Sequence, residues 1–126
     1  HAKWSHIYEV FARLAESVVL RVGFFHNSHG VHGTPERTQN GVVRTNCVDC
    51  LDRTNVLQFF VGLEVLKQQL TALNLLPEPR LDFDSQVVFV LSELYDIMGD
   101  HLALQYAGSV AHKKYQLLGS RPRMMT

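Results

Sequence analysis

The amino-acid sequence predicts an α/β fold in which a strand and a loop lead into a helix and further helices follow. Two observations predict it. Apolar residues recur at steps of three and four in three long segments, which is the pattern of amphipathic helices. The short segment 41–44 contains adjacent valines and follows a polar loop, as a buried strand would. Together these patterns are typical of the end of an α/β domain.

Composition and charge restrict the class of protein. Hydrophobic residues make up 46% of the 126 residues and charged residues 19%, which is typical of a globular chain. Lys and Arg together number 12, as do Asp and Glu, and this balance argues against non-specific nucleic-acid binding without excluding a local basic pocket. The longest apolar runs fall short of the roughly 20 residues of a membrane span. Two cysteines are too few for a disulfide framework and suit a reducing cytosolic setting.

The first apolar pattern predicts a helix over residues 4–21, with Ser5 near its start and Gly23 just past its end. Residues 22–25 are expected to form a short strand. Residues 26–40 are expected to form a surface loop, because they are rich in His, Asn, Ser, Gly, Thr and Pro and show no apolar period. The stripe of this helix consists of Trp4, Ile7, Tyr8, Phe11, Leu14, Ala15 and Val18.

Two further helical patterns follow the strand expected at 41–44. The first predicts a helix from Thr54 to about Leu73, which Pro77 and Pro79 are expected to break. Its stripe consists of Val56, Phe59, Phe60, Leu63, Leu66, Leu70 and Leu73.

The second pattern predicts a helix that Asp84 or Ser85 caps and Gly99 closes. A separate, shorter helix is expected at 100–106. The stripe of the capped helix consists of Val87, Val88, Leu91, Leu94, Tyr95 and Met98.

A cysteine followed six residues later by an arginine, Cys47 and Arg53, lies between the expected strand and the second helix. Successive backbone N–H groups of such a turn can hold phosphate oxygens, and the helix N-terminus adds partial positive charge. The planar guanidinium of Arg53 can bind two phosphate oxygens at once. The same field favours Cys47 as a thiolate. The pattern therefore predicts attack of Cys47 on phosphorus, with the charge stabilised by Arg53 and the loop amides.

The twelve residues 44–55, RTNCVDCLDRTN, resemble the signature of the Sac-domain phosphoinositide phosphatases, R-x-N-C-x-D-C-L-D-R-T-N, at every defined position. Gly99-Asp100 followed by residues 105–109 is similar to the downstream element G-D…Q-Y-[AG]-G-[ST] of that family. The segments 14–19 with 23–25, and 81–84 with 93–95, resemble most the subfamily that hydrolyses phosphatidylinositol 3,5-bisphosphate.

The resemblance implies that residues 1–126 are a C-terminal fragment of a Sac catalytic domain, and the start at His1 and the irregular end favour a fragment too. It implies removal of the 5-phosphate from phosphatidylinositol 3,5-bisphosphate, at the cytosolic face of endosomal, lysosomal or vacuolar membranes, to which the protein binds peripherally. It implies no metal cofactor for bond cleavage. It also implies a complex of the full-length protein with a lipid kinase and a scaffold.

The candidate site residues are those of the loop. Cys47 and Arg53 are expected to be catalytic, and Asp49 or Asp52 is expected to protonate the leaving oxygen, unless these carboxylates cap the helix or bind loop amides. Thr54 is expected to cap the second helix together with Asn55, or to donate to the thiolate. The expected substrate-binding residues are Arg44, Asn46, Val48, Cys50, Leu51 and Thr54.

Other side chains allow more than one interpretation. Cys50 is expected either to pack against its neighbours or to form a reversible disulfide with an oxidised Cys47. A zinc site is not expected, because zinc would need two more ligands. The histidines at 26, 29 and 32 are expected to be exposed loop residues rather than metal ligands. The basic residues Lys113, Lys114, Arg121 and Arg123 either meet anionic lipid or form a solvated surface.

Three alternative functions remain. One is a broad-specificity Sac phosphatase that acts on phosphatidylinositol 4-phosphate. Another is a Cys-x5-Arg protein phosphatase, although such enzymes usually carry His where Asn46 stands. The third is a scaffold fragment that retains the loop without catalysis.

Overall fold

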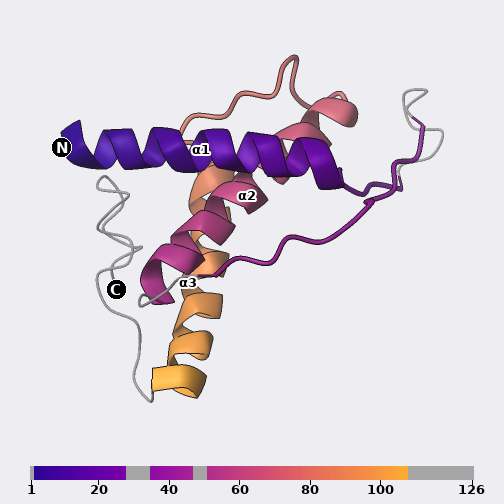
Figure 1. Cartoon of the computed structure of the whole chain (residues 1–126). Helices are drawn as coiled ribbons and strands as arrows, with labels where there is room; N and C mark the ends of the chain where they lie inside the picture. Colours follow the sequence, from indigo (N-terminus) through magenta and orange to yellow (C-terminus); the bar gives the residue numbers. More distant parts are fainter. Residues whose placement is uncertain (1, 28–34, 47–50, 108–126) are drawn as a thin grey trace. The chain divides into compact units, whose positions relative to one another are not determined.

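The computed structural model describes residues 2–27, 35–46 and 51–107. They contain three helices, α1 (Ala2–Val22), α2 (Leu51–Ala72) and α3 (Gln86–Ala107), shown in Figure 1. The chain divides into two compact units, one of residues 1–44 and 60–81 and one of residues 45–59 and 82–126. Helix α2 therefore contributes its first part to the second unit and its remainder to the first unit. None of the helices in the described part of the chain is long and apolar enough to span a bilayer.

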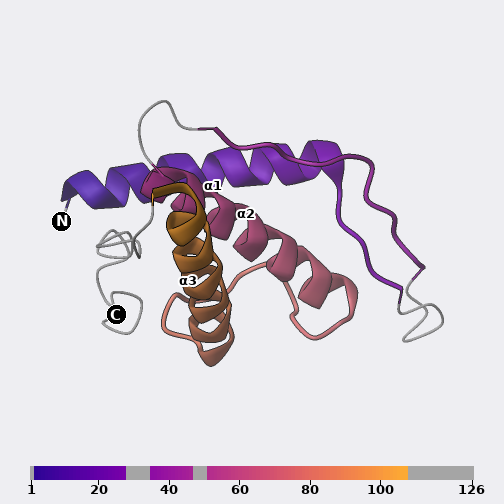
Figure 2. The same ribbon diagram turned by 90° about the horizontal axis from the view of Figure 1, so that it is seen from below.

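Helix α1 confirms the first helical pattern and its end. Gly23 has a φ of 73°, and its N–H donates to the carbonyl of Val19 at 2.7 Å. A glycine in the left-handed region with this bond is a common way to end a helix, since an L-residue at this φ is strained within its own backbone. The chain then turns back, and the N–H of Asn40 donates to the carbonyl of Val22 at 2.6 Å (Figure 2).

We expect Gly23→Ala to destabilise the intact protein by about 1–2 kcal/mol, because an L-residue in the left-handed region is unfavourable by that amount. The added Cβ itself fits, since its nearest neighbour would be Asn40 Nδ2 at 3.6 Å. Gly41→Ala is the matched control: its Cβ would lie 3.5 Å from Val22 Cγ1, and Gly41 does not have a positive φ. Denaturant unfolding measures both variants, and equal stability of the two would contradict the left-handed cap.

The structure assigns no strand to either segment where the sequence predicts one, which corrects the expected strand–loop–helix. Residues 22–25 end α1 and continue as coil, and β pairing within the described residues is limited to the isolated bridge between His26 and Arg37. Residues 41–46 alternate between partly buried and exposed, the period of an extended chain. Among the described residues they have no neighbouring strand to pair with. Adjacent β-branched residues favour an extended chain, but they do not provide that neighbouring strand.

Helix α2 begins three residues earlier than the pattern predicts and ends before the prolines. Asn74 has a φ of 61° and its N–H donates to the carbonyl of Thr71 at 3.0 Å, while the N–H of Leu75 donates to the carbonyl of Leu70 at 2.8 Å. This pair of bonds is a Schellman motif, in which asparagine takes the left-handed position. Asn74, rather than Pro77 or Pro79, therefore ends the helix.

Helix α3 confirms the cap at Ser85 and corrects the break at Gly99. The N–H of Val88 donates to Ser85 Oγ at 3.3 Å. Gly99 is helical, and the expected short helix at 100–106 is a continuation of the same helix. A glycine inside a helix costs only about 1 kcal/mol, which the buried Ala103 on the following turn helps to offset. Gly99 lacks the positive φ that would end the helix.

In the first unit, α1 packs on the second part of α2 through aromatic rings. The ring of Phe60 lies 5.7 Å from that of Tyr8 and 6.0 Å from that of Phe11. Ala15 and Val19, on the following turns of α1, are buried. Burial raises the pKa of Tyr8 to about 12, so this phenol stays neutral across the physiological range.

In the second unit, the first part of α2 packs on α3. Val56, Phe59 and Val88 are fully buried, and the rings of Phe59 and Tyr95 meet edge to face at 6.0 Å. This core holds the N-terminal turns of α2 in place, and those turns directly follow the cysteine loop in the sequence.

Candidate phosphate site at the start of helix α2

The cysteine loop is followed at once by a helix N-terminus. Helix α2 begins at Leu51, whereas the sequence places the helix start at Thr54. The first four N–H groups of any α-helix have no partner within the helix, and the helix dipole makes this end partially positive. Those groups belong here to residues 51–54, so part of the predicted anion loop is itself the first turn of α2.

Arg53 and Thr54 lie in this first turn. The side chain of Arg53 is exposed and that of Thr54 is partly buried. An exposed guanidinium at a helix N-terminus adds full charge to the partial charge of the N–H groups, and both attract an anion. For Leu51 and Asp52 the structure gives the backbone position in the same turn. Cys47, Val48, Asp49 and Cys50 lie outside the described residues, so their predicted roles stay predictions.

The expected cap at Thr54 and Asn55 is corrected by the position of the helix start. Both residues lie inside α2, with Asn55 four positions beyond its first residue. Asn55 is only 3% exposed, and its Nδ2 has no hydrogen-bond partner among the residues that the structure describes. Asn55 and its neighbour Val56 are both buried. Burial of this kind is unusual for a polar side chain inside a helix.

The segment that enters the loop is tied to α2. Gln58 Nε2 donates to Thr45 Oγ1 at 2.7 Å, across 13 residues and in a partly buried setting. Thr45 lies two positions before Cys47. Neither residue could be selected from the sequence, because a hydrogen bond between two polar side chains far apart in the sequence has no periodic signal. Thr45 occupies a variable position of the signature, which gave no reason to select it.

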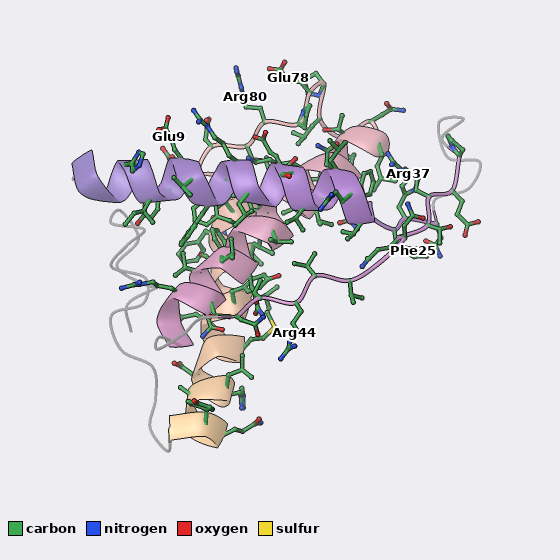
Figure 3. The ribbon with its side chains drawn as sticks, in the orientation of Figure 1. Glu9, Phe25, Arg37, Arg44, Glu78 and Arg80 are labelled. Atoms are coloured by element: carbon green, nitrogen blue, oxygen red, sulfur yellow. The ribbon has the colours of Figure 1, made fainter. Side chains whose placement is uncertain are left out.

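The flanking candidates Arg44 and Asn46 are both exposed. The side chain of Arg44 extends away from the coil (Figure 3). Arg44 is the last residue of the first unit before α2, whereas Asn46 belongs to the second unit. The substrate-binding roles of Arg44 and Asn46 stay predictions.

The histidine expectation needs one correction. His26 is 7% exposed rather than exposed, its backbone pairs with Arg37, and its ring stacks on Phe24 with centroids 6.2 Å apart. His29 and His32 lie outside the described residues. The described part of the chain contains no cluster of three His, Cys, Asp or Glu side chains that could hold a metal ion.

Known proteins share the sequence of this chain closely. It is 49% identical over 98 residues to a polyphosphoinositide phosphatase of Schizosaccharomyces pombe, which is 78% of this chain and 12% of that protein. It is 51% identical over 83 residues to the phosphatidylinositol-3-phosphatase SAC1 of Arabidopsis thaliana, covering 66% of this chain and 9% of that protein. It is 46% identical over 93 residues to human synaptojanin-1, covering 73% of this chain and 6% of that protein.

The chain belongs to the Sac family of phosphoinositide phosphatases. The family resemblance that the cysteine loop predicts is therefore confirmed. The matched regions of these three Sac relatives amount to between 6% and 12% of their length. No family model and no solved structure matches the chain.

Proposed function

We propose that the protein containing this chain is a phosphoinositide phosphatase that cleaves a phosphomonoester through a cysteinyl-phosphate intermediate. The observation that carries the proposal is the sequence from Cys47 to Arg53, whose last three residues form the first turn of α2. The names of the relatives support the substrate class, since they include polyphosphoinositide phosphatase and phosphatidylinositol-3-phosphatase.

The reaction takes two steps. In the first, the thiolate Sγ of Cys47 attacks phosphorus, an S–P bond forms, and the P–O bond to the inositol ring breaks. Asp49 or Asp52 gives a proton to the departing oxygen, which leaves as an alcohol. In the second, water attacks phosphorus and gives a proton to the aspartate carboxylate that lost one in the first step, and the S–P bond breaks. The products are inorganic phosphate and the regenerated thiolate.

Two kinds of group at the start of α2 can stabilise the charge on phosphorus. The N–H groups of the first turn of α2 carry partial positive charge and the guanidinium of Arg53 carries full positive charge. Both therefore stabilise negative charge on the phosphoryl oxygens. A bidentate arginine can follow two equatorial oxygens while phosphorus moves between the leaving oxygen and the thiolate. These groups can act in both steps, because each step transfers the same phosphoryl group.

The finer proposal is removal of the 5-phosphate from phosphatidylinositol 3,5-bisphosphate. It rests on the subfamily-like segments 14–19 with 23–25 and 81–84 with 93–95. Such selectivity requires a second cationic contact, since one loop binds only the phosphate that is cleaved. Arg44, Lys113 and Lys114 are the candidates within this chain, and the two lysines lie outside the described residues. Peripheral binding to endosomal, lysosomal or vacuolar membranes, and a complex with a lipid kinase and a scaffold, rest on the resemblance alone.

The test is kcat/KM of the intact protein on vesicles that contain the 3,5-bisphosphate, 4,5-bisphosphate, 3-phosphate or 4-phosphate lipid. We expect the 3,5-bisphosphate to be preferred over the monophosphates by one to two decades, because one charged hydrogen bond contributes roughly 1.5–3 kcal/mol. A phosphopeptide serves as the comparison for a protein phosphatase. If the 4-phosphate lipid is the best substrate, the protein is a broad-specificity Sac enzyme, and if the phosphopeptide is best, the lipid assignment is wrong.

A further inference from the structure

We propose that the first unit contains a ligand site of its own, a cavity that binds a small zwitterion. The ligand carries a primary ammonium group joined by a short chain to one anionic group, a phosphate diester or a carboxylate. The cavity has a volume of about 460 Å³, which is within the range of small-molecule sites. Its lining residues in the described part of the chain all belong to the first unit. None of them lies in the predicted catalytic loop, so the site goes beyond the proposed phosphatase function.

The wall of the cavity contains a buried carboxylate. Val19 and Phe24 are buried and give the cavity an apolar surface, and Glu64, which also lines it, is only 8% exposed. Gln68 Nε2, one turn further along α2, donates to Glu64 Oε2 at 2.8 Å and orients the carboxylate. This neutral donor leaves the charge uncompensated, and burying a charge costs free energy unless the charge is paired. A ligand ammonium would supply both the opposite charge and N–H donors.

Arg37 gives the same cavity a positive charge in a fixed position. Its guanidinium carbon lies 4.2 Å from the centre of the Phe24 ring, and its backbone pairs with that of His26 through two hydrogen bonds of 3.2 and 3.1 Å. A guanidinium that stacks on an aromatic face keeps its N–H groups at the edge of its plane, where they can bind two oxygens of an anion. The side chain of Arg37 makes no ion pair with another described residue. These donors are therefore available to an anionic group of a ligand.

The balance of charge in the cavity selects a zwitterion. Glu16 and Lys67 also line it, so it has two carboxylates and two cations, and none of these four groups makes an ion pair with another described residue. A ligand with only an anion would meet both carboxylates, and a ligand with only a cation would meet both basic groups. A zwitterion can pair each of its charges with an opposite one, and such electrostatic complementarity gives specificity. The ammonium has to be primary, because a quaternary ammonium has no N–H to donate to Glu64.

The experiment measures binding to the intact protein by isothermal titration calorimetry. One probe is glycerophosphoethanolamine, a soluble zwitterion whose phosphate diester is not consumed by cleavage of a phosphomonoester. β-Alanine is the corresponding probe with a carboxylate. Glycerophosphocholine keeps both charges but has a quaternary ammonium, and glycerophosphoglycerol keeps only the anion, so these two compounds are the matched controls. Vesicles of phosphatidylcholine with and without phosphatidylethanolamine present the same headgroup on a lipid surface.

We expect the zwitterions with a primary ammonium to bind at least about tenfold more tightly than the two control compounds, because each control lacks a charged hydrogen bond. Glu64→Gln and Arg37→Gln should each weaken binding by about one to two decades for the same reason. Glu64→Gln retains an acceptor for Gln68, and Arg37→Gln retains its backbone pairing. Glu9→Gln and Arg13→Gln remove the same charges from exposed positions of α1 that do not line the cavity, and they should match wild type.

The source of the ligand follows from which probes bind in a way that depends on Glu64 and Arg37. Such binding of the soluble zwitterions alone supports a soluble ligand, and such binding of vesicles that contain phosphatidylethanolamine supports a lipid headgroup.

The proposal is overturned if no zwitterionic probe binds the intact wild-type protein, or if the control compounds bind as tightly as the zwitterions. It is also overturned if Glu64→Gln and Arg37→Gln bind as well as Glu9→Gln and Arg13→Gln. The comparison of compounds uses wild-type protein alone, so it decides even where circular dichroism shows that a variant fails to fold. Because calorimetry needs no turnover, the result is independent of the phosphatase assignment, and a protein without lipid-phosphatase activity would refute that assignment alone.

Discussion

Replacing Cys47 with serine in the intact protein is expected to abolish turnover while lipid binding survives. The serine hydroxyl has no accessible anionic form near neutral pH, whereas a cysteine at a helix N-terminus has a pKa lowered from about 8.5 to roughly 3.5–7.5. Attack on phosphorus should therefore fall by several orders of magnitude. The N–H groups of the first turn of α2 and the side chain of Arg53 remain in place, so the phosphate should still bind.

The measurement for Cys47→Ser is kcat on phosphoinositide vesicles, together with the Kd for the same vesicles. Retained binding serves as the control that the variant is folded. Turnover within tenfold of wild type would show that Cys47 is not the nucleophile. Loss of binding together with turnover would instead point to a structural effect of the substitution on the loop.

Replacing Arg53 with lysine should be nearly as damaging as replacing it with alanine. Arg53 lies in the first turn of α2, where a planar guanidinium can bind two oxygens of a phosphate aligned with the helix. A lysine ammonium is a point charge, and it cannot keep two directed hydrogen bonds while the phosphoryl group moves. Removing one group of this kind from an oxyanion site lowers kcat by about two to three orders of magnitude.

Arg80 provides a matched control for Arg53. It is an exposed arginine paired with Glu78 at 3.6 Å in the loop after α2 (Figure 3). An exposed ion pair contributes about 0–1 kcal/mol, so Arg80→Lys and Arg80→Ala should leave kcat unchanged. If Arg53→Lys restores most of kcat relative to Arg53→Ala, Arg53 is a general cation and the bidentate interaction is wrong.

The helices could be predicted from the sequence, whereas the strands could not. The helical periods of α1 and α2 and the caps at Gly23 and Ser85 are local signals, and the structure confirms the helices and the caps. A strand exists only with a partner, so the valines at 41–44 were insufficient evidence. The ends of α2 and α3 could not be predicted, because the sequence does not show which of several helix-breaking residues ends each helix. Asn74 ends α2 before the prolines because it adopts the left-handed conformation, and Gly99 does not end α3 because it remains helical.

The candidate site, like the fold, could be predicted from the sequence only in part. The loop residues could be selected from sequence, because the chemistry of phosphate binding restricts residue type and spacing within a short segment. The supporting side chains could not, since the bond from Gln58 to Thr45 joins residues 13 positions apart and the burial of Asn55 follows from the packing of the second unit. Periodicity even suggested the wrong role for Asn55, because a helix expected to start at Thr54 would have made it part of a cap.

The cysteinyl-phosphate is the central claim, and trapping it tests that claim most directly. The intact protein is mixed with a phosphoinositide carrying labelled phosphate, quenched within the first turnover, and digested for mass spectrometry. The mechanism predicts labelled phosphate on Sγ of Cys47 in wild type, and none on the corresponding peptide of Cys47→Ser. Turnover without labelled Cys47, or label on another residue, would contradict it.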